Sequence, residues 1–191
     1  MKRKSPPDLG PLVASLSTVE VERVFLRSVP QLDFVHGVPP RFFWTSGRPN
    51  RLNPRGIACI YLSDTELTAN MEWAHAWAGL PGDLQPKLTF HVRVRVERAT
   101  DLCNASTAEA LGLDDDDLFG NWRLAMGATR LQSLGALLAK RKAATAVLYP
   151  SAAGRALRAP GTNIAVFVAA LRRADRLEVI GPDDLPLEVF P

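Results

Sequence analysis

The stretch over residues 88–96 limits the choice of fold more than any other part of the chain. Its apolar residues alternate with polar ones, which is the pattern of a β-strand that buries one face. Apolar runs predict further strands at residues 19–28, 57–62, 144–149, 163–171 and 176–180. Helical patterns fall at residues 63–79, 105–111 and 128–142. Because strands and helices do not alternate regularly, we predict an α+β fold rather than a doubly wound parallel sheet.

Length and composition are those of one ordinary globular domain. The chain has 191 residues, of which 47% are hydrophobic and 23% charged, and this is enough for one core. We expect a flexible N-terminal segment over residues 1–18 and a folded domain over 19–191. The net charge of +3 is too small to indicate nucleic-acid binding. No apolar run reaches the roughly 20 residues that cross a bilayer, so we expect a cytoplasmic protein without membrane contact.

The segments between these elements are expected to be irregular. Residues 29–40 hold three prolines and a glycine, which predicts a loop, and residues 41–44 have the composition of a short strand. The four aspartates at 114–117 predict a solvated acidic loop, because they lack the spaced ligands and the glycine of a calcium site. The three histidines share no metal-ligand spacing, so no metal site is expected.

A loop rich in arginine precedes the strand at 57–62. Arg48, Arg51 and Arg55 lie among glycine, proline and asparagine residues at 46–56, a composition typical of a surface loop. A guanidinium offers paired donors that match phosphate oxygens, and glycine lets the backbone approach the same anion. Taken by itself, this composition is more typical of a solvated basic loop without a ligand.

The clearest helix start in the sequence comes directly after that strand. Ser63 and Glu66 have the S-x-x-E spacing of a capping box, in which each side chain bonds the backbone of the other. An apolar stripe is expected along one face of the helix, formed by Leu67, Met71, Ala74 and Ala78. Glu72 lies on a neighbouring face among small residues, so another group can approach its carboxylate closely. The alternative is a solvated charge on the helix surface.

In order and spacing, these segments resemble the RES domain family, which is named for an Arg, a Glu and a Ser. Arg51, followed by Asn53-Pro54, matches the motif arginine. Tyr61 ends the next strand ten residues later, and Glu72 lies on a helix eleven residues beyond Tyr61. No single motif is strong, and it is their shared order along the chain that carries the resemblance.

The resemblance extends to the second half of the chain. An apolar strand leads into Tyr149-Pro150-Ser151, and Gly161-Thr162-Asn163 opens the next apolar run. The sequence also departs from the family pattern. Leu52 stands where the family usually has an aromatic residue, and residues 152–160 lengthen the gap after Ser151, as a lid or as a longer turn. Arg27 is the candidate for a further arginine that the family often carries on its first strand.

The resemblance implies an ADP-ribosyltransferase-like fold, with a split, mixed β-sheet core and flanking helices. It further implies that NAD+ is consumed as a substrate, without a prosthetic group. A carboxylate beside the ribose stabilises the positive charge that develops as the nicotinamide–ribose bond breaks. The implied catalytic residues are Arg51, Glu72 and Ser151, and the implied NAD-binding residues are Arg27, Arg51, Tyr61, Ser151 and Asn163. Each of these residues, taken singly, also fits an ordinary structural role.

The same resemblance implies a toxin that is paired with an antitoxin. The antitoxin of such pairs usually carries an Xre-like DNA-binding helix-turn-helix and is implied to block the active-site entrance. The acceptor of the ADP-ribose is left open between water, phosphate and a protein, and a protein acceptor would make the chain a mono-ADP-ribosyltransferase. A non-catalytic binding module or an RNA-acting toxin is the alternative from another class. A homo-oligomer is compatible with the sequence.

Overall fold

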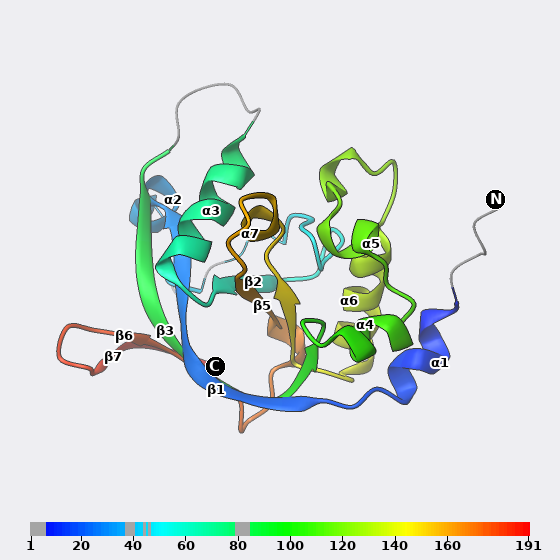
Figure 1. Ribbon diagram of the computed structural model, residues 1–191. Coiled ribbons are helices and arrows are strands. Elements are labelled where there is room, and N and C mark those ends of the chain that lie inside the picture. Colours follow the sequence, from blue (N-terminus) through cyan, green and yellow to red (C-terminus); the bar gives the residue numbers. More distant parts are fainter. Residues whose placement is uncertain (1–6, 37–40, 44, 46, 79–84) are drawn as a thin grey trace.

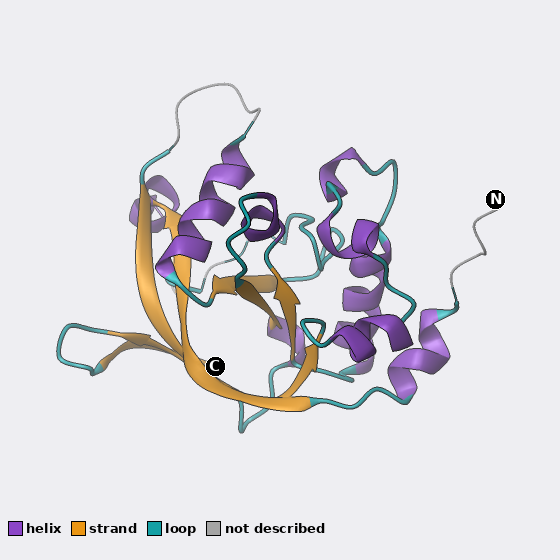
Figure 2. Cartoon of the chain, viewed as in Figure 1, coloured by secondary structure: helices purple, strands orange, loops and turns teal. Residues whose placement is uncertain are grey.

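A seven-stranded mixed sheet forms the centre of the molecule, and short helices flank it (Figures 1 and 2). The computed structural model describes residues 7–36, 41–43, 45, 47–78 and 85–191. The strands are β1 (Val19–Pro30), β2 (Cys59–Ser63), β3 (Lys87–Asp101), β4 (Ala146–Pro150), β5 (Thr162–Phe167), β6 (Arg176–Ile180) and β7 (Pro186–Phe190). The predicted α+β class, with one mixed sheet and flanking helices, is confirmed.

The first five strands close on themselves. The sheet order is β1-β2-β5-β4-β3-β6-β7, and β1 pairs additionally with β3. β3 and β4 are parallel, whereas β1 is antiparallel to both β2 and β3. β1 and β3 are the two long strands and lie side by side from Val19 opposite Ala99 to Pro30 opposite Lys87. β1 also pairs with β2, and β3 with β4, so the β1–β3 pair joins the two edges of the group formed by β2, β5 and β4 (Figure 1).

The alternation at 88–96 is realised in β3. Val92, Val94 and Val96 are fully buried, whereas Arg93 between them is half-buried and Arg95 is exposed, as are the flanking His91 and Glu97. The valines pack in an apolar cluster with Phe25 of β1 and with side chains of β2 and β6. A register shift of one residue would turn every one of these valines to solvent, so the pattern also fixes how β3 pairs with β1.

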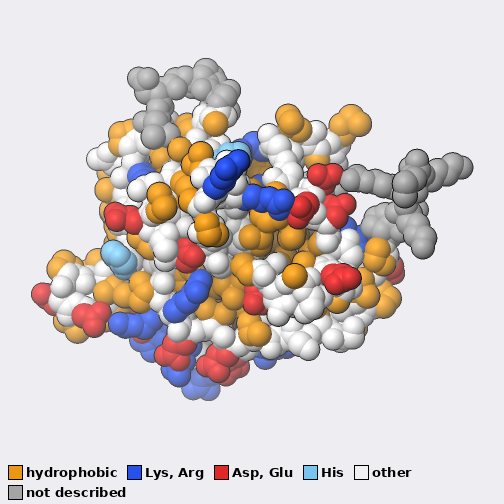
Figure 3. All heavy atoms as spheres, viewed as in Figure 1, with side chains coloured by type: hydrophobic (Ala, Val, Ile, Leu, Met, Phe, Trp, Pro, Cys, Tyr) orange, Lys and Arg blue, Asp and Glu red, His pale blue; other side chains and the backbone are white. Residues whose placement is uncertain are grey.

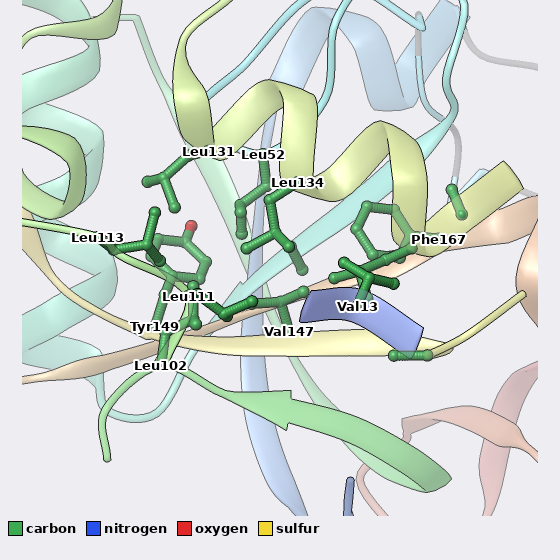
Figure 4. Packing of buried hydrophobic residues seen from close by; sticks show 14 of the residues in the cluster. Val13, Leu52, Leu102, Leu111, Leu113, Leu131, Leu134, Val147, Tyr149 and Phe167 are labelled. Carbon is green, nitrogen blue, oxygen red and sulfur yellow. The ribbon is translucent and has the colours of Figure 1, made fainter. Parts of the chain in front are cut away.

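A second apolar cluster lies under the longest C-terminal helix, α6 (Arg130–Arg141). Leu131, Leu134 and Leu138 of α6 are buried against Val147 and Phe167 of the sheet (Figure 4). Thr129 and Gln132 form a capping box at the start of the helix, and Lys140 and Arg141 lie in its last turn. Acceptors at the start and cations at the end both suit the helix dipole, so the helix expected at 128–142 is confirmed.

Of the remaining helices, α3 (Glu66–Trp77) is as long as α6 and the others are short. The short ones are α1 (Leu9–Ala14), α2 (Gln31–His36), α4 (Ala105–Ala110), α5 (Asp115–Phe119), η1 (Trp122–Leu124), α7 (Ala152–Ala156) and η2 (Val168–Ala170). None of the helices in the described ranges is both long and apolar enough to cross a membrane.

Several expectations about irregular segments differ from the structure. Part of the segment 1–18, expected to be flexible, forms α1, because Asp8 caps the helix and Leu9 and Val13 are buried against α6. The expected loop at 29–40 instead contains the last two residues of β1 and the whole of α2, and positions 37–40 lie outside the described residues. Residues 41–43 form a turn rather than a strand.

The acidic stretch is also helical rather than a loop. The Asp114 carboxylate accepts a hydrogen bond from the Asp117 backbone amide, and the Asp117 carboxylate accepts one from the Asp114 backbone amide, which is a capping box. Carboxylates in the first turn of a helix are stabilised by the unpaired amides and by the helix dipole. The aspartates therefore start α5 at the position where a solvated loop was expected. β7 and α7 were not predicted, because both are short and their neighbours carry turn residues.

A buried carboxylate ties the start of β6 to β3 and β4. Asp175 is 2% exposed. Its carboxylate accepts hydrogen bonds from the backbone amides of Glu97 and Arg172 at 2.9 and 2.8 Å and from the Thr145 hydroxyl at 3.0 Å. We predict that Asp175→Ala lowers the free energy of unfolding by about 3 kcal/mol, because three donors lose their acceptor. Urea unfolding measures this.

The exposed Asp183, in the turn between β6 and β7, provides the matched control. Asp183→Ala should change the free energy of unfolding by less than about 0.5 kcal/mol. Equal effects of the two substitutions would contradict a structural role for the Asp175 carboxylate.

Candidate active site

The candidate site is a cavity of about 330 Å³ bounded by β1, β2, α3 and the arginine loop. Its volume lies in the range of small-molecule sites. Arg27, Arg51, Tyr61, Glu72 and Asn163 all line it, although they come from five different segments, namely β1, the arginine loop, β2, α3 and β5. On the face shown in Figure 3, basic side chains gather between α3 and α5, next to a group of acidic ones. The structure thus brings together five of the six predicted site residues around one cavity.

Glu72 is held by two hydrogen bonds to one of its oxygens. Its Oε1 accepts from the Ser151 hydroxyl at 2.6 Å and from the Asn163 side-chain amide at 2.9 Å. The Asn163 amide is itself oriented, because its Oδ1 accepts from the Ser63 hydroxyl at 2.8 Å. Glu72 Oε2 receives no hydrogen bond from the described residues. The network therefore fixes the carboxylate and leaves one of its oxygens for a ligand.

Ser151, the sixth predicted residue, lies behind the carboxylate rather than in the cavity wall. It is 2% exposed and is not among the residues that line the cavity. Its hydroxyl donates to Glu72 and also accepts the Gly154 amide at 2.8 Å as the N-cap of α7. A serine hydroxyl can donate and accept at once, so this residue links the start of α7 to Glu72. This helix forms the first part of residues 152–160, the segment that lengthens the gap after Ser151.

The placement of Glu72 follows from which face α3 buries. Thr65, not Ser63, caps the helix, since its hydroxyl accepts the Thr68 amide at 3.1 Å. Ser63 instead ends β2, where it bonds Asn163. The predicted stripe of Leu67, Met71, Ala74 and Ala78 is wrong except at Met71, because the other three are exposed. The buried positions are Thr68, Ala69 and Met71, which turns the Glu72 side of the helix inward.

The arginine loop is buried at its centre, unlike the surface loop that its composition predicts. Arg51 is 7% exposed, Leu52 0% and Asn53 2%. Leu52 packs in the cluster under α6 (Figure 4). Arg51 Nη1 donates to the backbone carbonyls of Leu118 and Gly120 at the end of α5, at 3.0 and 3.2 Å. These bonds occupy one nitrogen of the guanidinium and direct the group along the cavity wall.

Tyr61 fastens this loop through its hydroxyl. The hydroxyl donates to Asn53 Oδ1 at 2.6 Å and accepts the Leu52 amide at 3.1 Å. Asn53 Nδ2 in turn donates to the carbonyls of Arg48 and Ile57, both at 2.9 Å. Burial raises the pKa of Tyr61 well above its ordinary value, so the phenol stays neutral and keeps both bonds. The ring lines the cavity, while the hydroxyl belongs to the loop.

Arg27 brings a second guanidinium to the cavity from β1. It donates to the carbonyls of Tyr61 at 3.0 Å and Phe42 at 3.4 Å. Burial lowers its pKa to about 10, which still leaves the group charged at neutral pH. Among the described residues, no group of His, Cys, Asp and Glu side chains is arranged to hold a metal ion. The charged groups that line the cavity thus include the Arg27 and Arg51 guanidiniums, the fixed Glu72 carboxylate and a second carboxylate, Asp33.

Comparison with known proteins assigns the family. The sequence model of the RES domain matches residues 26–189. The chain belongs to the RES domain family. No curated protein matches it. Among solved structures it is similar to a chain of the crystal structure of the M. tuberculosis MbcT–MbcA toxin–antitoxin complex, with a TM-score of 0.67 and 20% identity over 90% of this chain and 88% of that one. At this identity the likeness concerns the fold.

Two residues of this RES domain site were not predicted. Ser63 was interpreted as a helix cap, and its bond to Asn163 depends on β2 and β5 pairing with Ser63 opposite Asn163. Tyr149 lines the cavity beside Asn163, its partner in the β4–β5 register. Both positions are strand ends, and only the pairing of strands far apart in sequence reveals that they lie beside Asn163, which bonds Glu72.

A glycine of α6 lets the arginine loop approach the helix. A Cβ atom at Gly135 would overlap the Leu52 carbonyl oxygen. We predict that Gly135→Ala lowers the free energy of unfolding by about 2 kcal/mol, because the overlap outweighs the gain of about 1 kcal/mol in helix propensity. The matched control is Gly127→Ala, at a glycine with open space around it. A stabilised Gly135→Ala variant in thermal unfolding would contradict this packing.

Proposed function

We propose that this RES domain is the toxin component of a toxin–antitoxin pair and that it cleaves the nicotinamide–ribose bond of NAD+ in the cytoplasm. The observation that carries the proposal is the Glu72 carboxylate, held through Oε1 by Ser151 and Asn163. A second support is the pair of guanidiniums, Arg27 and Arg51, in the wall of the same cavity. The family membership and the fold shared with a chain of a toxin–antitoxin complex agree with this assignment.

The chemistry needs a fixed negative charge beside the sugar. When the bond between the ribose carbon and the nicotinamide nitrogen breaks, the bonding electrons leave with nicotinamide and positive charge develops on the ribose. A carboxylate that is already oriented stabilises this charge without reorganising. Water then adds to the sugar carbon and loses a proton, which gives ADP-ribose; inorganic phosphate in place of water gives the phosphorylated sugar. Neither route requires a prosthetic group.

The other residues position the reacting groups. Arg51 and Arg27 are cations within a partly buried wall, where they can pair with the pyrophosphate of NAD+. Ser151 and Asn163 act through Glu72, since each donates to its carboxylate. Tyr61 keeps the arginine loop in place through Asn53 and Leu52, and its ring offers a flat surface to the nicotinamide.

The partner in this proposal is an antitoxin of the Xre type that covers the cavity entrance. Trp122 and Arg123 line the cavity, and the next residues of that segment expose large apolar side chains. Leu124 is 79% exposed and Met126 is fully exposed. Exposed apolar side chains next to a charged cavity are suited to a protein partner.

Release of nicotinamide tests the reaction. We predict that the purified protein releases nicotinamide from NAD+ and that Glu72→Gln lowers the rate by about 100-fold or more, because the neutral amide cannot stabilise the developing charge. The amide oxygen can still accept from Ser151 and Asn163, so the fold should be retained.

Glu66→Gln, at an exposed position of the same helix, is the matched control and should leave the rate unchanged. Equal rates for the native protein and Glu72→Gln would exclude Glu72 as the catalytic carboxylate. Transfer of labelled ADP-ribose from NAD+ to a protein would instead identify the chain as a mono-ADP-ribosyltransferase.

A further inference from the structure

Two tyrosines line the cavity, the half-buried Tyr61 and the buried Tyr149, and their hydroxyls differ in their hydrogen bonds. The Tyr61 hydroxyl is fully engaged by Asn53 and by the Leu52 amide. Tyr149, on β4, is 6% exposed and also lines the cavity. Its hydroxyl makes no hydrogen bond with the described part of the chain, yet it is not among the side-chain oxygens that are sealed from solvent without a partner. The Tyr149 hydroxyl therefore opens into the cavity.

Packing explains where the Tyr149 ring lies but not why it carries a hydroxyl. The ring belongs to the cluster under α6, with Leu102, Leu111 and Leu113 around it (Figure 4). A phenylalanine would fill the same space. A hydroxyl that opens into a cavity and has no protein partner is available to hydrogen-bond a ligand there.

The neighbours of this hydroxyl are the charged groups of the site. Burial raises the pKa of Tyr149 well above its ordinary value; the Glu72 carboxylate raises it further, and the Arg51 guanidinium opposes the change. The phenol is therefore neutral at physiological pH and can donate or accept a hydrogen bond. Tyr149 also lies opposite Asn163 in the strand pairing, and Asn163 is bonded to Glu72. All of these relations place the residue beside the carboxylate.

We propose that the Tyr149 hydroxyl hydrogen-bonds a hydroxyl of the nicotinamide ribose and so positions the sugar next to Glu72. This assignment rests on the proposed function. Tyr149 holds the ribose while Glu72 stabilises the charge that develops on it. Of the two cavity tyrosines, Tyr149 then serves substrate binding through its hydroxyl, and Tyr61 serves the architecture of the arginine loop.

The two tyrosine-to-phenylalanine variants separate these roles. Tyr149→Phe should leave the Tm within about 2 °C of the native value and raise the KM for NAD+ about tenfold, the effect of one lost hydrogen bond. Tyr61→Phe should lower the Tm by about 5 °C, because the Leu52 amide and the Asn53 oxygen lose their partner. A Tyr149→Phe variant with a lowered Tm and an unchanged KM would overturn the proposal.

Binding measurements without turnover complete the test. In the Glu72→Gln background, calorimetry should show about tenfold weaker NAD+ binding with Tyr149→Phe. For a NAD+ analogue that lacks the contacted ribose hydroxyl, the proteins with and without Tyr149→Phe should bind equally. If the Glu72→Gln proteins with and without Tyr149→Phe bind NAD+ equally, only the role of Tyr149 is overturned. Absence of both NAD+ binding and nicotinamide release in the native protein overturns the proposed function as well.

Discussion

The pair of hydrogen bonds at Glu72 Oε1 is the interaction on which the rest of the site depends. Ser151 donates from the start of α7 and Asn163 from the beginning of β5, so a helix residue is fixed by two segments about 80 to 90 residues further along the chain. A carboxylate that faces a cavity is easily drawn toward water or a nearby cation. Here the two donors, and Ser63 behind Asn163, keep it in one orientation before any ligand arrives.

The arginine loop depends on a second set of polar contacts. Burying a guanidinium is unfavourable unless its donors find acceptors, and Arg51 uses the carbonyls at the end of α5. The loop is also anchored from the helix side, because the Gln132 amide donates to the Asn50 carbonyl at 2.9 Å. Gln132 is at the same time part of the capping box of α6. The contacts that start this helix therefore also place the loop that carries Arg51.

The sequence predicts most of the strands and the helix α6 because their periodicity is local, whereas for α3 it predicts the extent but not the buried face. The alternation in β3 and the spacing of the leucines in α6 each indicate which face of the element is buried. Residues whose roles depend on pairing were not predictable in the same way. Ser63 has the spacing of a helix cap, but its hydroxyl bonds Asn163 across the β2–β5 pair. Local composition cannot show that contact.

In the candidate site, too, the sequence predicts the residues that belong to local motifs and misses those that only the fold brings together. The motif order selects Arg51, Tyr61, Glu72 and Asn163, and the structure places all four around one cavity. Composition suggested an exposed loop, whereas Leu52 is fully buried. Its side chain packs in the apolar cluster under α6, while its neighbours Arg51 and Asn53 line the cavity. Tyr149 carries no local sequence signal as a site residue, since a tyrosine in an apolar strand is usually part of the core.

The most direct test of this account is a crystal structure of the Glu72→Gln variant with NAD+ bound. The account predicts that the nicotinamide ribose lies against residue 72, with the pyrophosphate beside Arg51 and the Tyr149 hydroxyl within hydrogen-bonding distance of the sugar. NAD+ bound outside this cavity, or bound in it with the pyrophosphate rather than the ribose against residue 72, would contradict the central role assigned to the Glu72 carboxylate.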